Sequence, residues 1–340
     1  MKRQCLTLIS LIFVSLSQLA PAGATQDNTL RYGESVRPDT LDPYTSRESS
    51  SLRLSELIFN GLIRINEKQE IEPDLAESWE ISQDRKTFTF YLRKNVYWHN
   101  KNPRKYPFTA KDVIFTEQLI SHPKTDSDKK YIFENFNDLK ALDDYTLQVT
   151  LKERAIASLA LFQFKILPAH VLAKFKFLSK RNPFSNKPIG TGPYQYLRSN
   201  HNRDITLEAN PAYYAGAPKI KHIITKPFAD TNIMIQALTF NALDLIVNVN
   251  PRHYAELQAN PDFKLISYNT LSYSFFAYNE RNPHLANQKV RKAISHAIDR
   301  QQMLQAFFNG QGSVISGPFA PGSWAYNLDI PPDQYDPNIS

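Results

Sequence analysis

Cysteine is nearly absent from this chain of 340 residues, which contains only Cys5. Because Cys5 lies so close to the start, the chain after residue 24 has no thiol. This absence excludes disulfide bonds, cysteine nucleophiles and cysteine-ligated zinc from that part of the chain. Glycine is also scarce: there are 10 glycines and 22 prolines, whereas average usage predicts roughly 24 glycines in this length. Many turns must therefore be built from other residues.

The sequence also lacks a block of charge of one sign. Its 40 basic and 33 acidic side chains give a formal net charge of +7. Nucleic-acid binding needs basic residues clustered on one face, so this mild and scattered excess argues against nucleic acid as a partner. The composition, with 42% hydrophobic and 12% aromatic residues, is that of a globular protein. At about 100–200 residues per domain, the length predicts two or three lobes.

The only long apolar run lies at the N-terminus and predicts secretion. Lys2 and Arg3 precede an apolar stretch over 6–16, and residues 22–24 are small, as a signal peptidase requires. The stretch is too short to span a membrane, which takes about 20 apolar residues. We therefore expect a signal peptide over 1–24, cleavage after Ala24 and a periplasmic protein. Cys5 precedes the apolar run instead of following it, so no lipid-attachment cysteine is expected.

Hydrophobic periodicity in the rest of the chain predicts a mixed α/β fold. Alternation predicts strands over 87–92, 145–151 and 220–224, and a short apolar run predicts another over 243–249. Helical spacing predicts helices over 46–62, 112–121, 231–240 and 287–308, with Thr109 as an N-cap and Gly310 as a left-handed C-terminal cap. A Pro, Asn and Lys cluster over 181–188 marks the predicted crossing between domains.

Residue types of common catalytic sites occur without the spacing that those sites require. No two of the eight histidines are placed as metal ligands, which favours surface or turn histidines. The Gly190-Thr191-Gly192 segment is followed by Pro193 and no helix start, so it predicts a turn into a strand and no dinucleotide site. Acidic pairs such as Asp74 with Glu77 are favoured as solvated turn residues. We predict no catalytic residue, no metal site and no cofactor.

A series of short motifs follows one order along the chain. The motifs are Leu41-Asp42-Pro43, FNGL over 59–62, PDLAESWEIS over 73–82, KTFTFYLRK over 86–94, TAKDV over 109–113, IGTGPY over 189–194, NPAYY over 210–214, Ala237-Leu238 with Leu243-Asp244, and KVRKAI over 289–294 with AIDR over 297–300. In this order they resemble the extracytoplasmic solute-binding proteins of peptide and nickel ABC transporters, the oligopeptide-binding type of family 5. No single motif is decisive, so the identification depends on their number and order.

The resemblance implies an α/β, two-lobed fold of the type II periplasmic-binding-protein kind. Residues 25–50 and 184–268 are then the core of lobe I, 51–183 an extra domain packed on it, and 269–340 the beginning of lobe II. The strands over 87–92 and 243–249 are accordingly expected in different sheets. Asn95 and Asn241 stand where the family has glycine, and both are expected at positive φ.

Compared with the family, most of the second lobe and the returning C-terminal strands are missing. The resemblance therefore implies a fragment, an inactive truncated product or one half of a split gene with a separately encoded C-terminal half. An apolar face of lobe I and the stripe between 290 and 308 are expected to be uncovered, which predicts marginal stability without a partner.

For function, the resemblance implies a receptor that closes on short peptides and delivers them to a membrane permease. The loop after Leu41-Asp42-Pro43 corresponds to a ligand-contacting segment, and the chain enters lobe II near residue 271. The candidate ligand-binding residues are Ser46, Arg47, Glu48, Tyr273, Phe275 and Phe276. Their structural alternatives are a polar loop that caps the next helix and core aromatics in a strand. The residue that receives the peptide's α-amino group is expected beyond residue 340.

Two other functions stay open on the sequence alone. Within the same family the ligand can be a nickel complex, haem or a sugar. In a different class, a secreted hydrolase requires two acidic residues that converge in a pocket. The acidic residues that would have to line such a cleft are Asp42, Asp74, Glu77 and Asp112.

Overall fold

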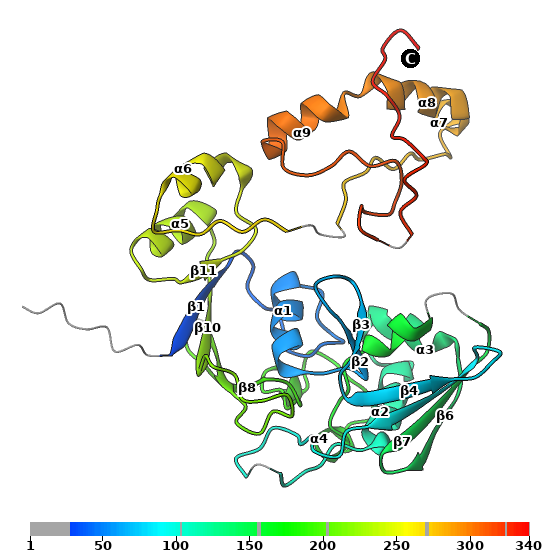
Figure 1. The fold of residues 1–340 in the computed structure, drawn as a ribbon, viewed down its shortest axis with the longest axis vertical. Coiled ribbons are helices and arrows are strands. Elements are labelled where there is room, and N and C mark those ends of the chain that lie inside the picture. The colour runs from blue at the N-terminus through cyan, green and yellow to red at the C-terminus, as the bar shows by residue number, and fades with distance from the viewer. Residues whose placement is uncertain are drawn as a thin grey trace, which may run out of the picture.

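The computed structural model describes residues 28–339, except residues 103, 155–157, 202–203, 269–271 and 324. The expected signal peptide and its cleavage site after Ala24 therefore lie outside the described residues. The described strands form three sheets with helices between and around them, which is the expected mixed α/β architecture (Figure 1). In this part of the chain no helix has the length and apolar character needed to cross a membrane.

The largest sheet has five strands in the order β11-β1-β10-β9-β8. These strands are β1 (Thr29–Glu34), β8 (Tyr194–Ser199), β9 (Ile205–Ala209), β10 (His222–Pro227) and β11 (Leu245–Ile246). β1 is parallel to both β10 and β11, whereas β8, β9 and β10 pair antiparallel. A parallel pair needs a crossover connection, and α5 (Thr231–Thr239) supplies it between β10 and β11. The carboxyl ends of β1, β10 and β11 therefore lie at the same edge of the sheet.

The second large sheet is antiparallel and has the order β4-β5-β7-β6. Its strands are β4 (Ala76–Ile81), β5 (Thr87–Leu92), β6 (Phe136–Asp143) and β7 (Thr146–Leu151). Phe88, Phe90 and Leu92 are buried on one face of β5, as the alternation predicts. α2 (Ala110–Ser121) packs on β6, and the N–H of its N-cap Thr109 donates to Asp112 Oδ2 at 3.0 Å, which confirms the predicted cap.

A middle layer joins the two large sheets. It contains α1 (Ser49–Ile58), the hairpin of β2 (Ile63–Ile65) and β3 (Ile71–Pro73), and η2 (Ser158–Gln163). Figure 1 shows α1 between the β1–β10 strands and the second sheet. One hydrophobic core includes Ile58 of α1, Phe90 of β5 and Leu207 of β9. The strands near 87–92 and 243–249 lie in different sheets, as expected, while the domain boundaries proposed above stay predictions.

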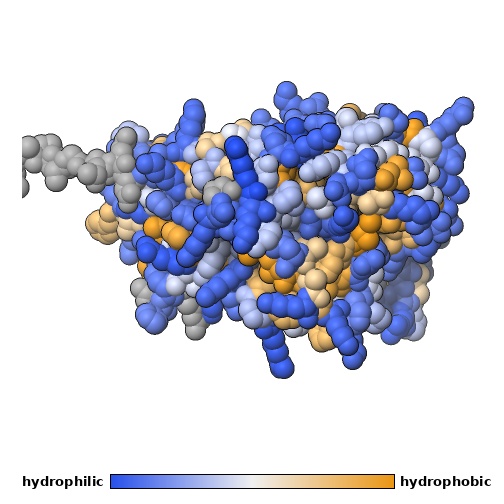
Figure 2. Space-filling view, turned by 90° about the horizontal axis from the view of Figure 1, so that it is seen from below, coloured by the Kyte–Doolittle hydropathy of each residue, from blue (hydrophilic) through white to orange (hydrophobic). Residues whose placement is uncertain are grey.

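Short helices occupy several of the connections. They are η1 (Asp128–Lys130), α3 (Tyr131–Glu134), α4 (Ala169–Leu172), η3 (Pro183–Ser185), η4 (Pro251–His253) and α6 (Tyr254–Ala259). Figure 2 views the molecule from the side on which α4 and β8 lie in Figure 1. Hydrophilic side chains cover most of this face, with smaller apolar areas between them.

The last described part of the chain carries α7 (Pro283–Ala286), α8 (Gln288–Ala297) and α9 (Arg300–Phe308), none of which has a buried residue. Figure 1 shows this orange and red region beyond the end of the five-stranded sheet that carries α5 and α6. It reaches the rest of the protein where α9 meets η4. Of the predicted stripe, Phe307 and Phe308 are 68% and 47% exposed, as expected. The expectation is wrong for the half-buried members, which are Val290, Ile294, Ile298 and Leu304. The marginal stability inferred from this exposure stays a prediction.

The predicted helix over 287–308 is wrong in one respect, because it is broken into α8 and α9. Asp299 interrupts it, since its carboxylate accepts from the N–H of Gln302 at 2.8 Å and so caps a new helix. The left-handed C-cap of α9 is Asn309, with φ 50°, and Gly310 after it also has the expected positive φ, 74°. The short polar side chain of Asn tolerates this conformation, which allows the cap to come one residue earlier.

Two other boundaries and one turn also differ from the predictions. α1 covers ten residues of the predicted 46–62, because Phe59 is extended at φ −121°. β11 covers only two residues of the predicted 243–249, and Asn248 has a positive φ of 54°. Asn241 has the expected positive φ, 56°, whereas Asn95 does not, so the expectation for Asn95 is wrong.

Candidate functional site

The edge where β1, β10 and β11 end is the candidate binding region, which we call the strand-end site. In open α/β sheets, ligands bind outside the carboxyl ends of parallel strands where the following connections diverge. β1 continues through residues 35–48 into α1, whereas β10 continues into α5. α1 and α5 lie on opposite sides of the β1–β10 pair in Figure 1. The divergence therefore places the loop 35–48 at the rim of this site.

A buried ion pair closes the end of β1 at this rim. Glu34 is fully buried, and its carboxylate accepts from Arg53 Nε at 2.8 Å, Arg53 Nη2 at 2.6 Å and the Tyr32 hydroxyl at 2.6 Å. The hydrogen bond to Glu34 raises the pKa of Arg53. Burial, followed by the contact with Glu34, raises the pKa of Tyr32. Both groups keep their protons, so Arg53 is a fixed cation whose side chain remains 35% exposed at the rim.

Arg53→Met is expected to lower the free energy of unfolding by about 3 kcal/mol, because it leaves the buried Glu34 carboxylate without a cation. Adding Glu34→Gln to Arg53→Met is expected to recover most of this loss, since the amide has no charge. Urea unfolding of the two single variants and the double variant measures the coupling free energy. Arg64→Met is the matched control: Arg64 and Glu72 pair at 2.8 Å with both side chains exposed, so about 1 kcal/mol or less is expected. Equal losses in Arg53→Met and Arg64→Met would contradict this prediction.

Asp39 holds the loop between β1 and α1 in place. Its Oδ1 accepts from the hydroxyls of Ser46 and Ser51 at 2.9 and 3.0 Å, and its Oδ2 accepts from Lys180 Nζ at 2.5 Å. Burial opposes ionisation of Asp39, but the Lys180 ammonium and the two hydroxyls outweigh it and lower its pKa. The loop is therefore ordered by a carboxylate that stays ionised. No motif or spacing in the sequence marks Asp39 or Lys180 for this role.

The three loop residues predicted to touch ligand have different environments. Ser46 is buried, and its hydroxyl is used by Asp39. Arg47 is exposed, with a guanidinium nitrogen 3.4 Å from Asp126. Glu48 is half-buried at the N-cap of α1, where its side chain makes no capping hydrogen bond. The structure places all three at the rim of the strand-end site, and their contact with a ligand stays a prediction.

The predicted aromatic residues lie in a segment that is not a strand. Tyr273, Phe275 and Phe276 are 41%, 72% and 63% exposed, so the alternative of core aromatics in a strand is wrong. The rings of Tyr273 and Phe275 contact each other with centroids 5.6 Å apart. Among the described residues, no hydrogen bond, ion pair or ring contact links this group to the predicted loop residues 46–48. The two predicted groups are therefore not brought together directly.

The acidic residues required by a hydrolase are mostly buried in structural roles. Asp42 accepts from Tyr44 N at 2.9 Å, and Asp112 accepts from Thr109 N and Ala169 N at 3.0 Å each. Asp74 is 2% exposed. The expectation of a solvated turn residue is therefore wrong for Asp74. Neither of the two cavities described below is lined by these three or by Glu77.

Asp42 gives a prediction for the pH dependence of stability. Burial raises its pKa to about 6, although the Tyr44 N–H partly compensates. Its Oδ2 has no hydrogen-bond partner among the described residues. Because the pKa is higher in the folded than in the unfolded chain, the native state binds the proton more tightly, and this contribution to stability is lost as pH rises from about 4 to about 6.

Asp42→Asn is expected to remove that loss. Between about pH 4 and pH 7, the stability of the variant relative to the wild type should increase by on the order of 2–3 kcal/mol. Urea unfolding of both proteins across this range measures the difference, and other titrating groups cancel in it. Stability curves that run parallel over the whole range would contradict the raised pKa.

His99 is a buried histidine with hydrogen bonds to both ring nitrogens, and the spacing of the histidines in the sequence did not predict this environment. It is buried, its Nδ1 accepts from Gly190 N at 3.2 Å, and its Nε2 lies 2.9 Å from the carbonyl oxygen of Gly192 and donates to it. Burial lowers its pKa to about 4, so the ring is neutral near neutral pH. The expectation of a surface or turn histidine is wrong for His99, which instead joins the loop after β5 to the Gly190–Gly192 turn.

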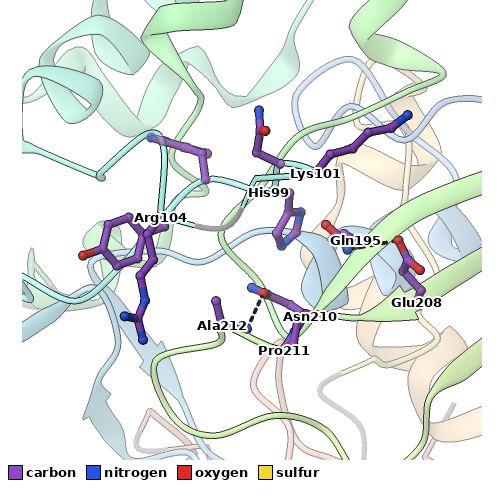
Figure 3. A pocket seen from close by; sticks show the side chains of 11 residues that line it. His99, Lys101, Arg104, Gln195, Glu208, Asn210, Pro211 and Ala212 are labelled. Atoms are coloured by element: carbon purple, nitrogen blue, oxygen red, sulfur yellow. Dashed lines mark hydrogen bonds between the residues drawn. The ribbon is translucent and has the colours of Figure 1, made fainter.

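A cavity of about 240 Å³ lies beside His99, between residues 97–101 with Arg104 and the paired strands β8 and β9 (Figure 3). Gln195 and Glu208 line one side, where Gln195 Nε2 donates to Glu208 Oε1 at 3.0 Å. Glu208 pairs with His222, the first residue of β10. The cavity therefore lies at the opposite end of the sheet from the strand-end site.

A second cavity, of about 370 Å³, is on the side of the strand ends. It is lined by Tyr254 and Gln258 of α6, by residues 263–265 and 267, and by Gln311 after α9. Gln311 of the last described region thus contributes to the wall of a hollow beside α6. Within the described ranges, no three His, Asp or Glu side chains are grouped so as to hold a metal ion.

Comparison with known proteins decides the family of this chain. Residues 70–339 match the model for bacterial extracellular solute-binding proteins, family 5, middle region. The chain belongs to this family. The match confirms the resemblance read from the motifs, and the extracellular character of the family agrees with the expected export from the cytoplasm.

The relatives with curated names bind different solutes. Heme-binding protein A of Haemophilus influenzae is 28% identical over 335 residues, which cover 93% of this chain and 61% of that protein. The dipeptide-binding protein of Escherichia coli is 26% identical over 342 residues, which cover 95% of this chain and 64% of that protein. This chain thus spans less than two thirds of either relative.

Solved structures show the same fold. NikZ from Campylobacter jejuni, in complex with Ni(L-His), and the periplasmic binding protein DppA from Helicobacter pylori, in complex with the peptide STSA, each have a TM-score of 0.80 and 26% identity. Each match covers 92% of this chain, with 61% of NikZ and 64% of DppA. These neighbours are two-lobed periplasmic binding proteins, so the predicted α/β fold class is confirmed. The comparisons give no support to a separately encoded C-terminal half.

Proposed function

We propose that this chain is the substrate-binding component of an ABC transporter, which captures short peptides at the strand-end site and delivers them to a membrane permease. The observation that carries the proposal is the similarity over 92% of the chain to a binding protein solved with a bound peptide. On this proposal the protein is a receptor and not an enzyme. Closure of its lobes is driven only by the ligand's higher affinity for the closed form.

The chemistry of the rim supports a ligand that carries a carboxylate. Arg53 is held at the end of β1 by Glu34, and Arg47 stands on the adjoining loop with only a long, exposed contact to Asp126. Cations in these positions suit the carboxylate end of a peptide. Hydrogen bonds to the backbone of an extended peptide provide affinity that does not depend on its side chains. We therefore expect little sequence preference among short peptides.

A nickel complex is the second candidate, because NikZ with bound Ni(L-His) matches this chain as well as the peptide-bound DppA does. Such a complex also presents a carboxylate to the cations of the rim. Haem and sugars have weaker support, since only the named relatives suggest haem and no residue of the strand-end site favours a sugar.

Isothermal calorimetry with the whole chain tests the proposal. Di-, tri- and pentapeptides of unrelated sequence are titrated in parallel with Ni(L-His), haem and a disaccharide. Arg47→Ala is expected to weaken peptide binding by about 1.5–3 kcal/mol, the range for a hydrogen bond to a charged group. Arg198→Ala is the matched control and is expected to have no effect, because Arg198 is exposed on the edge strand β8, with β9 between it and β10. Heat from Ni(L-His) or haem, with none from any peptide, would replace the proposal.

A further inference from the structure

Two segments distant in the sequence form one continuous surface. The N–H of Leu178 donates to Thr125 Oγ1 at 3.1 Å, and the N–H of Asp126 donates to the carbonyl oxygen of Leu178 at 3.3 Å. The rings of His122 and Phe177 stack with centroids 5.9 Å apart. These contacts join residues 122–131 to residues 174–181, and we call the joined surface the basic face.

Positive charge dominates the basic face. Its cations are Lys124, Lys129, Lys130, Lys174, Lys176, Lys180 and Arg181, and its acidic residues are Asp126 and Asp128. Arg47 approaches Asp126, and Lys180 pairs with Asp39, so part of this charge is balanced internally. Lys124, Lys174, Lys176 and Arg181 are exposed, and none of the ion pairs among the described residues includes them. Four cations are therefore free to meet an external anion.

Aromatic side chains stand among these cations. Tyr131 is 62% exposed and Phe177 is 37% exposed. Phe175 is less exposed than either and packs against the core, with Lys174 Nζ 5.2 Å from its ring centroid. Over 174–177 the chain alternates Lys, Phe, Lys and Phe. Cations beside exposed aromatic rings are typical of surfaces that bind at the boundary between water and lipid headgroups.

We propose that the basic face binds the surface of a membrane that contains anionic phospholipids. The negative potential of such a surface attracts exposed Lys and Arg side chains, and amphipathic aromatic rings enter the headgroup layer. Neither cavity adjoins this face, and its unpaired cations beside the exposed rings of Tyr131 and Phe177 suit an anionic headgroup layer above lipid. The family is extracellular, so the outer surface of a membrane is within its reach.

Binding through this face places the strand-end loop close to the membrane. Lys129 Nζ donates to the carbonyl oxygen of Pro43 at 2.6 Å, and Lys180 and Asp126 contact Asp39 and Arg47 of the same loop. The basic face and the rim of the strand-end site are therefore neighbouring parts of one surface. Electrostatic binding to lipid would then hold this rim at the membrane surface. The inference depends on the charges of the face and holds whatever the ligand proves to be.

Vesicle flotation with the whole chain tests the inference. Vesicles of phosphatidylcholine with phosphatidylglycerol are compared with vesicles of phosphatidylcholine alone, at low and at high salt. The protein is expected to bind only the anionic vesicles, and raised salt should release it. Each exposed cation contributes roughly fivefold, so the variant Lys124→Gln, Lys174→Gln, Lys176→Gln and Arg181→Gln together should lose binding by several hundredfold. Thermal unfolding of the variant checks that the fold is retained.

A matched variant separates the basic face from the overall net charge. Lys68→Gln, Lys219→Gln, Lys221→Gln and Lys292→Gln together remove the same charge from exposed positions outside the face. Retention of binding in this control, with loss in the first variant, supports the inference. Equal loss in both variants would assign the binding to net charge and overturn it. The inference would also be overturned, in favour of a protein partner, if the wild-type protein did not bind anionic vesicles but bound an acidic loop of a permease in neutral vesicles.

Discussion

Gly190→Ala is expected to prevent the chain from reaching its native fold. A Cβ at this position would lie 1.8 Å from the carbonyl oxygen of Ile58 at the end of α1, and that oxygen is backbone and has no freedom to rotate away. The carbonyl oxygen of Gly190 also accepts from His99 N at 2.8 Å, so the turn is held from both sides. The expected loss of stability exceeds about 4 kcal/mol, which places it among the largest effects of a single substitution.

The yield of soluble protein and its thermal unfolding curve measure the effect. Gly192→Ala should behave similarly, because its Cβ would lie 2.4 Å from the carbonyl oxygen of Leu57. Gly317→Ala is the control, since nothing lies within 4 Å of a Cβ there and its φ is unexceptional. A Gly190→Ala protein that unfolds as cooperatively as Gly317→Ala, at nearly the same temperature, would show that α1 can move away from the turn at little cost.

Asp74→Ala is expected to lower the free energy of unfolding by about 3–5 kcal/mol. The Asp74 carboxylate accepts from Asn60 Nδ2 at 2.9 Å, Gly61 N at 3.1 Å and the Tyr214 hydroxyl at 2.5 Å. Alanine would leave these three donors without an acceptor in the interior. Asn60 and Gly61 follow α1, whereas Tyr214 follows β9, so the carboxylate connects the middle layer to the five-stranded sheet.

Urea unfolding of Asp74→Ala, Asp74→Asn and Glu77→Ala measures this contribution. Asp74→Asn keeps one acceptor oxygen, and its loss should fall between those of the other two variants. Glu77 is exposed on β4, so Glu77→Ala should change the stability by about 0.5 kcal/mol or less. A loss for Asp74→Ala within the range of Glu77→Ala would mean that water satisfies the three donors.

Local patterns in the sequence identified the regular elements that have a buried and an exposed face. The alternation over 87–92 predicted β5 to the residue, and Thr109 was recognised as the N-cap of α2. The break between α8 and α9 was missed, because the apolar spacing continues across Asp299 while the helix does not. A side chain that caps a new helix competes with helix continuation, and hydrophobic spacing carries no information about that competition.

The sequence predicts the candidate site only in part. The motif order located the loop 46–48 and the segment 273–276, and the structure places the loop at the strand ends. The motif order did not identify Glu34, Arg53 or Asp39, because the role of each residue depends on a partner from another part of the chain. The residues next to a charged side chain in the sequence do not show whether it has a partner, or whether that partner is buried or exposed.

By itself, the sequence determined the family, the mixed α/β class and most of the helices and strands, because these depend on motif order and on periodicity within short windows. Tertiary structure decided the roles of individual residues. His99 was expected at the surface but is buried, with hydrogen bonds to the Gly190–Gly192 turn. Asp74 is also buried, and its carboxylate accepts hydrogen bonds from three donors. It also gathered a charge excess that is scattered in the sequence into one basic face, since residues 122–131 and 174–181 become neighbours only when Leu178 pairs with Thr125 and Asp126. Burial and charge proximity depend on contacts between distant segments, and those contacts exist only in the folded chain.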